Sequence, residues 1–241
     1  MADGDRFDEE LLTSVLSEFA HTLASRFEVS EVLYRLVEHV IQILGVDGAG
    51  VSVVDENGKL RPVTVPNELT HKLESVEEAH QQGPCIDAFH HADVVSVEQL
   101  DEVSHQWPDW CKAAAELGVH AVLGIPLRAH EQSLGAMNIY SHETREWSAG
   151  EIRVARVLCD MAASYVANAS ALDQAERTAE QLQEALESRI IIEQAKGVLA
   201  AEQRITVEEA FLVLRRHSRT HGVSLRAVAH AVVTLGLRPG S

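Results

Sequence analysis

Hydrophobic residues recur at helical spacing at the start of the chain and then change to the spacing of a β-strand. The first pattern predicts an amphipathic helix over residues 7–27. A second helix follows, and we expect Ser30 to cap it and Gly45 to end it, because these residue types favour those positions. Two helices therefore precede the first predicted strand.

A hairpin signal marks the first pair of strands. Residues 48–55 are small or β-branched, and Asn57 and Gly58 follow them closely. An Asn-Gly pair between two such runs is the strongest short-range indication of a β-hairpin, because the turn needs residues that accept positive φ. We expect the return strand over residues 59–65, closed by Pro66.

Helical and strand patterns alternate through the middle of the chain. Gly83 and Pro84 interrupt one polar helix, and Gly118 ends another. A polar turn over residues 128–132 joins the last two strands. The predicted elements are helices over residues 67–82, 85–91 and 107–117, and strands over residues 93–97, 119–127 and 133–141.

A capping box opens a long helix, because Glu151 follows Ser148 at the required spacing. No strong breaker interrupts residues 151–196, and apolar residues recur there every seven positions, which predicts a seam between two helices. We expect the early turns to cover the sheet and residues 168–190 to form a dimer stalk. The two series are Leu158, Tyr165, Leu172, Ala179 and Leu186, and Met161, Asn168, Ala175 and Leu182.

The tail is also predicted to be helical. Thr206 and Glu209 form a second capping box, Gly222 ends that helix, and Ser224 caps another, before Pro239 ends the fold. Three helices in about 55 residues indicate a small bundle, which a dimer interface would support.

Acidic side chains outnumber basic ones, but not evenly along the chain. The formal net charge is −17, with 37 Asp and Glu against 20 Lys and Arg. Residues 1–180 carry a net charge of −19, whereas residues 181–241 carry eight basic and six acidic side chains. An acidic surface repels nucleic acid and anionic lipid, but this argument does not extend to the tail.

Composition narrows the class of protein further. Hydrophobic residues make up 46% of the chain, which is enough for a buried core, yet no apolar run is long enough to span a membrane. The acidic start lacks the apolar region of a signal peptide. Cys85, Cys111 and Cys159 form neither a disulfide framework nor a CxxC pair. We therefore expect a cytoplasmic protein with reduced thiols and no membrane contact.

Three blocks of sequence follow one another in the tail. They are ALESRIIIEQAKGVL at residues 185–199, EEAFLVLRRHSR at residues 208–219 and SLRAVA at residues 224–229. Together they resemble the ANTAR domain, an RNA-binding antitermination module of bacterial regulators, over about residues 180–236. The resemblance implies that the tail binds a tandem stem-loop RNA leader and prevents transcription termination.

The middle of the chain carries a second set of matches. They are GPC at residues 83–85, WP at residues 107–108, GVHAVLGIPL at residues 118–127 and LGAMNIYS at residues 134–141. These resemble the GAF domain in the form that actinobacteria join to ANTAR tails. The resemblance implies an antiparallel sheet flanked by helices, with a pocket for a small-molecule effector.

Basic side chains of the tail are the candidate RNA contacts, because cations bind phosphates. Arg189 and Lys196 lie two helical turns apart and share a face, as do Arg215 and Arg219. The alternative is that the basic side chains of the tail are solvated charges paired with Glu193, Glu202, Glu208 and Glu209. With Gly197, which permits a close approach, and Ser218, which can donate to a phosphate, the candidate site is Arg189, Lys196, Gly197, Arg215, Arg216, Ser218 and Arg219.

One position departs from the ANTAR pattern. Many members carry Lys or Arg just before the Leu-Arg pair of the last helix, where this chain has Ser224. The substitution removes one positive charge from a tail whose net charge is already small. We therefore expect RNA affinity to be weak in a monomer and to improve when two tails lie side by side.

The front part of the chain offers little catalytic chemistry. Its sequence contains no nucleotide-binding, nucleophile-elbow or kinase motif, and its histidines lack metal-ligand spacing. No pair of carboxylates is singled out for acid–base work. Cys85 follows Gly83 and Pro84 and is expected near a helix N-terminus, where the pKa of a thiol is lowered, as a redox role would need. The alternative, which we favour, is that Cys85 is a small packed residue. We predict no enzyme, no metal and no cofactor other than an unidentified effector.

The patterns and resemblances predict an α+β protein of four parts. These are an N-terminal helix (1–29), a GAF-like sensor domain (30–167), a helical linker or coiled coil (168–184) and a three-helix ANTAR-like RNA-binding domain (185–236). We expect a homodimeric regulator whose sensor controls the tail. The alternatives are a protein-interaction regulator or small-molecule sensor without RNA binding, a small-molecule enzyme, and a DNA-binding tail.

Overall fold

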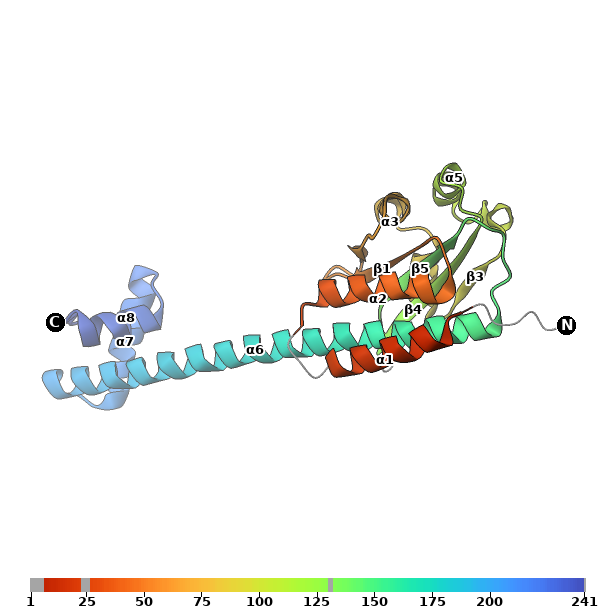
Figure 1. Cartoon of the computed structure of the whole chain (residues 1–241). Helices are drawn as coiled ribbons and strands as arrows, with labels where there is room; N and C mark the ends of the chain where they lie inside the picture. The colour runs from red at the N-terminus through yellow and green to blue at the C-terminus, as the bar shows by residue number, and fades with distance from the viewer. Residues whose placement is uncertain (1–6, 23–26, 130–131, 241) are drawn as a thin grey trace. The chain divides into compact units, whose positions relative to one another are not determined.

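The computed structural model describes residues 7–22, 27–129 and 132–240. The chain divides into a first unit, Met1–Ser170, and a second unit, Ala171–Ser241. Helix α6 (Ala149–Gln203) begins in the first unit and ends in the second (Figure 1). Among the described residues, no helix is both long enough and apolar enough to cross a membrane.

A five-stranded antiparallel sheet forms the centre of the first unit, in the order β2-β1-β5-β4-β3. The predicted hairpin is confirmed: Asp55 N–H donates to Lys59 O at 2.8 Å, and Gly58 has the positive φ of +76° that the turn requires. The strands are β1 (Gly48–Val54), β2 (Leu60–Thr64), β3 (Val95–Val97), β4 (Ala121–Ala129) and β5 (Gln132–Ser141).

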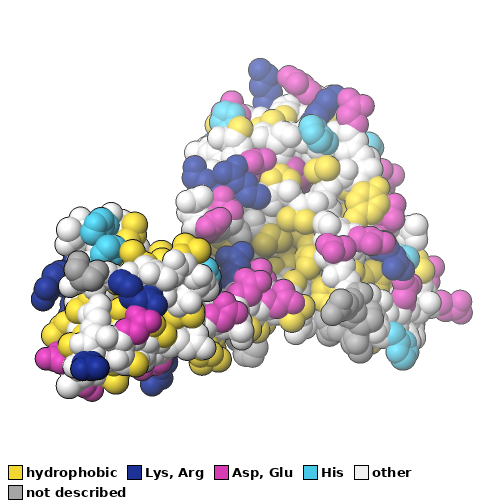
Figure 2. Space-filling model, turned by 90° about the vertical axis from the view of Figure 1, so that its left-hand side faces the viewer, with side chains coloured by type: hydrophobic (Ala, Val, Ile, Leu, Met, Phe, Trp, Pro, Cys, Tyr) yellow, Lys and Arg dark blue, Asp and Glu magenta, His cyan; other side chains and the backbone are white. Residues whose placement is uncertain are grey.

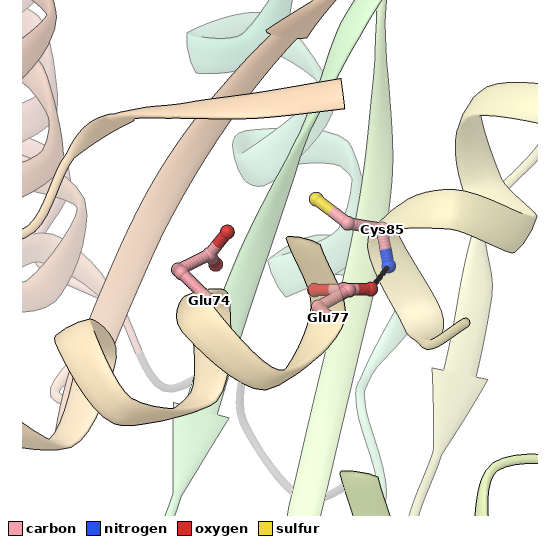
Figure 3. Close-up of side chains that lie close together, drawn as sticks. All are labelled: Glu74, Glu77 and Cys85. Atoms are coloured by element: carbon pink, nitrogen blue, oxygen red, sulfur yellow. Dashed lines mark hydrogen bonds between the residues drawn. The ribbon is translucent and has the colours of Figure 1, made fainter. Parts of the chain in front are cut away.

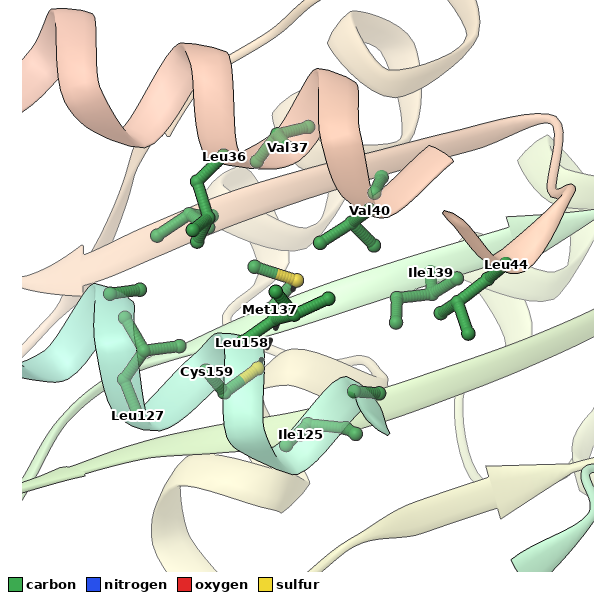
Figure 4. Close-up of a cluster of buried hydrophobic side chains, with 14 of the residues drawn as sticks. Leu36, Val37, Val40, Leu44, Ile125, Leu127, Met137, Ile139, Leu158 and Cys159 are labelled. Carbon is green, nitrogen blue, oxygen red and sulfur yellow. Dashed lines mark hydrogen bonds between the residues drawn. The ribbon is translucent and has the colours of Figure 1, made fainter. Parts of the chain in front are cut away.

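An apolar layer covers one face of the sheet. It consists of α1 (Glu9–Thr22), α2 (Val29–Leu44) and the first turns of α6, which lie together below the strands in Figure 1. Alternate strand residues such as Met137 and Ile139 point into this layer and meet Leu36 and Leu158 (Figure 4). This is the largest of the three hydrophobic clusters among the described residues of the first unit.

Three further helices cover the opposite face: α3 (Glu68–His80), α4 (Pro84–His91) and α5 (Pro108–Glu116), with the short helix η1 (Leu100–Val103) beside them. At the centre of this face, the strands carry small and polar residues. Asn138 of β5 lies between Gly50 of β1 and Gly124 of β4. A Cβ built on Gly124 would lie 2.7 Å from the carbonyl oxygen of Pro84, so α4 packs directly on the backbone of the sheet.

The second unit contains the end of α6 together with α7 (Val207–His221) and α8 (Leu225–Thr234). The predicted caps are confirmed: Thr206 and Glu209 form a capping box, and Ser224 Oγ accepts a hydrogen bond from Ala227 N–H. The small core consists of Ala195, Leu199, Ala210, Leu214, Val228, Ala229 and Val232. The three-helix tail is therefore as expected, with its first helix continuous with the long one.

Some predicted helix boundaries are wrong or lie partly outside the described residues. Ser30 does not cap α2, which begins at Val29 because Glu28 already takes the N-cap position without a side-chain hydrogen bond. Helix α1 ends at Thr22, and residues 23–26 of its predicted range are outside the description. The long helix extends seven residues past Lys196, to Gln203.

The heptad series divides as expected between buried and exposed residues. Leu158 and Tyr165 are 0% and 1% exposed and pack in the core of the first unit. Leu172, Leu182 and Leu186 are 60%, 66% and 54% exposed. The early turns therefore cover the sheet, and the dimer stalk stays a prediction.

Candidate functional site

A row of side chains on α7 carries three of the seven candidate RNA-binding residues. Phe211, Arg215, Ser218 and Arg219 recur at the spacing of one helix face. From α6, Lys196 Nζ lies 5.7 Å from the centre of the Phe211 ring, which places this ammonium beside the same row. We call Lys196, Arg215 and Arg219 the basic stripe.

The arginines of the candidate site have no partner in the part of the chain that the structure describes. Arg189, Arg215, Arg216 and Arg219 are exposed, and none of them forms an ion pair or a hydrogen bond through its side chain with any described residue. Figure 2 shows dark blue Lys and Arg side chains at several points on the visible face of the second unit. Free guanidinium groups with this exposure are available to phosphates.

Glutamates pair with three other cations of the second unit, as the alternative reading expects, whereas Arg204 is exposed and has no partner among the described residues. Lys196 Nζ lies 2.8 Å from Glu193 Oε1, and its side chain is only 17% exposed. Arg226 bridges Glu184 and Glu187 at 3.0 and 3.2 Å, and Arg238 pairs with Glu202. Glu209 serves the capping box instead of pairing with a cation.

Three small residues of the second unit have distinct surroundings. A Cβ built on Gly197 meets nothing within 4 Å, so packing inside the chain does not require this glycine. Ser218 Oγ donates to Val223 O at 2.6 Å at the end of α7, and its lone pairs stay available. Ser224, which replaces the basic residue of the family pattern, is committed to the N-cap of α8.

The first unit contains a buried polar cluster that sequence reasoning missed. Glu74 and Glu77 lie one turn apart on α3 and point toward Cys85 of α4 (Figure 3). Their relative exposures are 1%, 2% and 1%. One ligand atom from each of the three lies within 4.8 Å of the others. The sequence singled out no acidic pair and no group of metal ligands, because spacing along the chain does not show that these three residues meet in the fold.

Hydrogen bonds from three elements hold the carboxylates. Ser52 Oγ and Tyr140 Oη donate to Glu74 at 2.8 and 2.6 Å. Cys85 N–H donates to Glu77 Oε1 at 2.7 Å, and Asn138 Nδ2 donates to Glu77 Oε2 at 2.6 Å. These donors would favour the ionised forms, but burial dominates and raises the pKa of both carboxyls, with the charge of Glu74 raising the pKa of Glu77 further.

The expectation for Cys85 is wrong in its electrostatics. Cys85 does lie in the first turn of α4, as expected. However, burial raises the pKa of its thiol well above the usual value, and the charges of Glu77 and Glu74 raise it further. The N–H groups of the helix N-terminus already donate to Glu77, so they do not stabilise a thiolate.

Comparison with known families agrees with this division of the chain. The GAF domain family matches residues 28–166, and the ANTAR domain family matches residues 180–233. The chain belongs to the GAF family and also carries an ANTAR domain. These are sensor and regulatory domains, so this GAF–ANTAR chain has the organisation of a GAF-controlled regulator.

Solved structures resemble the GAF–ANTAR chain in its first unit. The GAF domain of a Coxiella burnetii phosphoenolpyruvate-protein phosphotransferase is 17% identical, with a TM-score of 0.54 over 68% of this chain and 98% of that one. The corresponding Acinetobacter domain is 14% identical, with a TM-score of 0.53 over 68% and 97%. A phycoerythrobilin-bound GAF domain from a cyanobacterial phytochrome is 16% identical, with a TM-score of 0.53 over 68% and 97%. These likenesses show the fold alone, and no curated protein matches the chain.

Proposed function

We propose that the second unit binds hairpin-forming RNA and thereby prevents transcription termination. The observation that carries the proposal is that the four arginines of the candidate site, which lie in an ANTAR domain, are exposed and unpaired among the described residues. Arg215 and Arg219 of the basic stripe lie one turn apart, a spacing suited to adjacent phosphates of an RNA strand. Lys196, held beside them by Glu193 and Phe211, would add a third cation.

The exposed leucines of α6 favour a dimeric form of this regulator. Leu172, Leu182 and Leu186 continue the seven-residue series beyond the sheet and stay largely exposed in a single chain. A second copy of the chain would bury them. Two tails joined in this way would bind two stem-loops of one RNA with a higher effective concentration than separate tails.

The first unit would control the tail instead of catalysing a reaction. The GAF family match and the absence of a catalytic motif in the sequence support a sensor in a cytoplasmic regulator. The space between Glu74, Glu77 and Cys85 is too tight to admit a water molecule. Pockets for organic ligands usually measure about 300–1,000 Å³, so an effector would enter here only after this face had opened.

RNA binding by the full chain tests the proposal directly. The double substitution Lys196→Ala and Arg215→Ala should weaken binding to an RNA with two short stem-loops by at least tenfold. It should also reduce the slope of log affinity against log salt by about 1–2, because each lost phosphate contact removes one counterion from the exchange. Fluorescence anisotropy at several salt concentrations measures both quantities.

The matched control is the double substitution Arg226→Ala and Arg238→Ala. It removes the same charge from the same unit, but from side chains outside the basic stripe, each of which pairs with a glutamate of α6. This control should change affinity by less than about threefold, since exposed ion pairs contribute little. Equal losses in both variants would show general attraction only, and no binding by the parent chain would leave protein interaction as the function of the tail.

A substitution at Gly197 should separate folding from binding. Gly197→Ala is expected to stabilise the second unit by about 1 kcal/mol, because glycine is a poor helix residue and the position is open. The same change should weaken RNA binding if the glycine serves a close approach of the backbone. Urea unfolding and anisotropy report the two effects. A gain in stability with unchanged RNA affinity would remove Gly197 from the candidate site.

A further inference from the structure

The buried cluster of the first unit has no part in RNA binding, yet it concentrates charge in an unusual way. Glu74 and Glu77 are both almost fully buried. No Lys, Arg or His among the described residues forms an ion pair with either carboxylate. Two neighbouring carboxylates that lack a counter-charge are costly to bury, and proteins usually resolve this with protons or with a cation.

The hydrogen bonds around Glu77 do not suit a protonated carboxyl. Its three partners are the N–H groups of Cys85 and Ile86 and the amide nitrogen of Asn138, which are all donors. None of these nitrogens can accept a proton from a carboxylic acid. The immediate surroundings of Glu77 are therefore arranged for an anion, although burial opposes one.

A second observation concerns Asn138, whose carboxamide lies at both carboxylates. Asn138 is 0% exposed, and its nitrogen is 2.6 Å from Glu77 Oε2 and 3.4 Å from Glu74 Oε1. Its oxygen Oδ1 is buried and has no hydrogen-bond partner among the described residues. Buried polar atoms are nearly always satisfied, so this oxygen lacks a donor where it lies, and a half-turn of the carboxamide would bring it to the carboxylates, where an electrophile between them would satisfy it.

The size and chemistry of this place restrict what that electrophile is. The space among the side chains does not admit a water molecule, so it fits a bare ion drawn between its ligands and not an organic molecule. Carboxylate oxygens alone would suit Mg²⁺ or Ca²⁺, but the sulfur of Cys85 beside them favours a softer ion. We propose that the first unit binds a divalent first-row transition-metal ion through Glu74, Glu77 and Cys85, with Asn138 Oδ1 as a further ligand.

Binding requires the carboxylates and the Cys85 thiol to draw together and the Asn138 carboxamide to turn over. The candidate ligand atoms lie within 4.8 Å of one another, whereas ligands of a four-coordinate ion lie about 3.5 Å apart. A half-turn of the Asn138 carboxamide would bring Oδ1 to the position of its nitrogen. The Cys85 S–H bond breaks, a metal–sulfur bond forms, and the thiol proton and any carboxyl proton pass to solvent.

The ion would link α3, α4 and β5. Glu74 and Glu77 come from α3, Cys85 from the first turn of α4 and Asn138 from the central strand. Gly83, just before α4, has a φ of +150°, and a Cβ there would collide with the carboxylate of Glu77. The loop between the two helices is thus shaped around this side chain. The inference concerns the first unit alone and stands whether or not the tail binds RNA.

Titration of the full chain with Co²⁺ tests the proposal. The protein is first treated with a chelator and a thiol-free reductant. We expect one equivalent of Co²⁺ to bind and to produce the near-ultraviolet charge-transfer band of a cobalt–thiolate bond. Zn²⁺ should displace the cobalt and abolish the band. Absence of the band in the parent chain overturns the proposal, however the variants fold.

Matched variants assign the band to the cluster. Cys85→Ala should abolish it, whereas Cys111→Ala, at a buried thiol in a separate hydrophobic cluster, should leave it intact. Glu77→Gln should weaken Co²⁺ binding at least tenfold, and Glu78→Gln, at the next residue, should not, because Glu78 pairs with Arg61. A band that survives Cys85→Ala, or an affinity unchanged by Glu77→Gln, would show binding elsewhere, for example at surface histidines, and would reject the site.

Discussion

Leu214→Ala is expected to unfold most of the second unit while the first unit stays folded. Leu214 is fully buried in a core of only seven residues. Truncation of a buried leucine to alanine costs about 2–5 kcal/mol, and small domains have about 5–15 kcal/mol in total. The loss is therefore a large share of what holds three short helices together. Urea unfolding followed by circular dichroism should show the transition of the second unit at a clearly lower midpoint, with the other transition unchanged.

The comparison with Leu212→Ala makes this result specific. Leu212 lies on the same helix but is 55% exposed, so its truncation should change stability by no more than about 0.5 kcal/mol. RNA binding should fall with the folded fraction in Leu214→Ala and stay unchanged in Leu212→Ala. Similar effects of the two substitutions would mean that the small core does not carry the stability of the unit and that a second copy of the chain does.

Local signals predicted the elements of this fold well. The turn at Gly58 and the caps at Thr206 and Ser224 depend on residues within a few positions of one another, and the structure confirms them. The prediction that Ser30 caps α2 is wrong because Glu28 and Ser30 compete for nearly the same position. N-cap preference contributes only about 1 kcal/mol, so packing of the helix face decides such a contest.

The buried cluster lay beyond local reasoning for a different reason. Glu74 and Glu77 belong to a polar helix, and nothing in that helix says which face is covered. Their burial depends on Asn138 and Tyr140, more than sixty residues later, which meet them across the fold. The usable signal was in the strands: small residues at every second position, such as Gly48 and Gly50, mark a face on which helices pack closely.

For the candidate RNA-binding residues, the sequence identified the basic side chains but not whether each of them is paired. Periodicity placed Arg215 and Arg219 on one face, and the structure adds that Phe211 joins them to Lys196. The sequence did not indicate which cations are paired, because Arg226 meets Glu184 and Glu187 only after α8 folds back on α6. Pairing between helices is a tertiary property, whereas a shared helix face follows from spacing alone.

Gly124→Ala is the second substitution from which we expect a large effect, this time in the first unit. The added Cβ would lie 2.7 Å from the carbonyl oxygen of Pro84, a backbone atom that cannot rotate away. Helix α4 must therefore shift outward from the sheet. Overpacking of this kind costs about 1–3 kcal/mol, and urea unfolding of the first unit measures it.

Gly48→Ala is the matched control on the same face of the sheet. Its Cβ would lie 3.0 Å from Leu69 Cδ2 and 3.2 Å from Thr70 Oγ1, both of them side-chain atoms that can move. We expect it to cost less than half as much as Gly124→Ala. Because α4 carries Cys85, its outward shift should also weaken the cobalt–thiolate band, which Gly48→Ala should preserve. Equal costs would show that α4 adjusts freely, and a rigid link between this helix and the buried carboxylates would then be untenable.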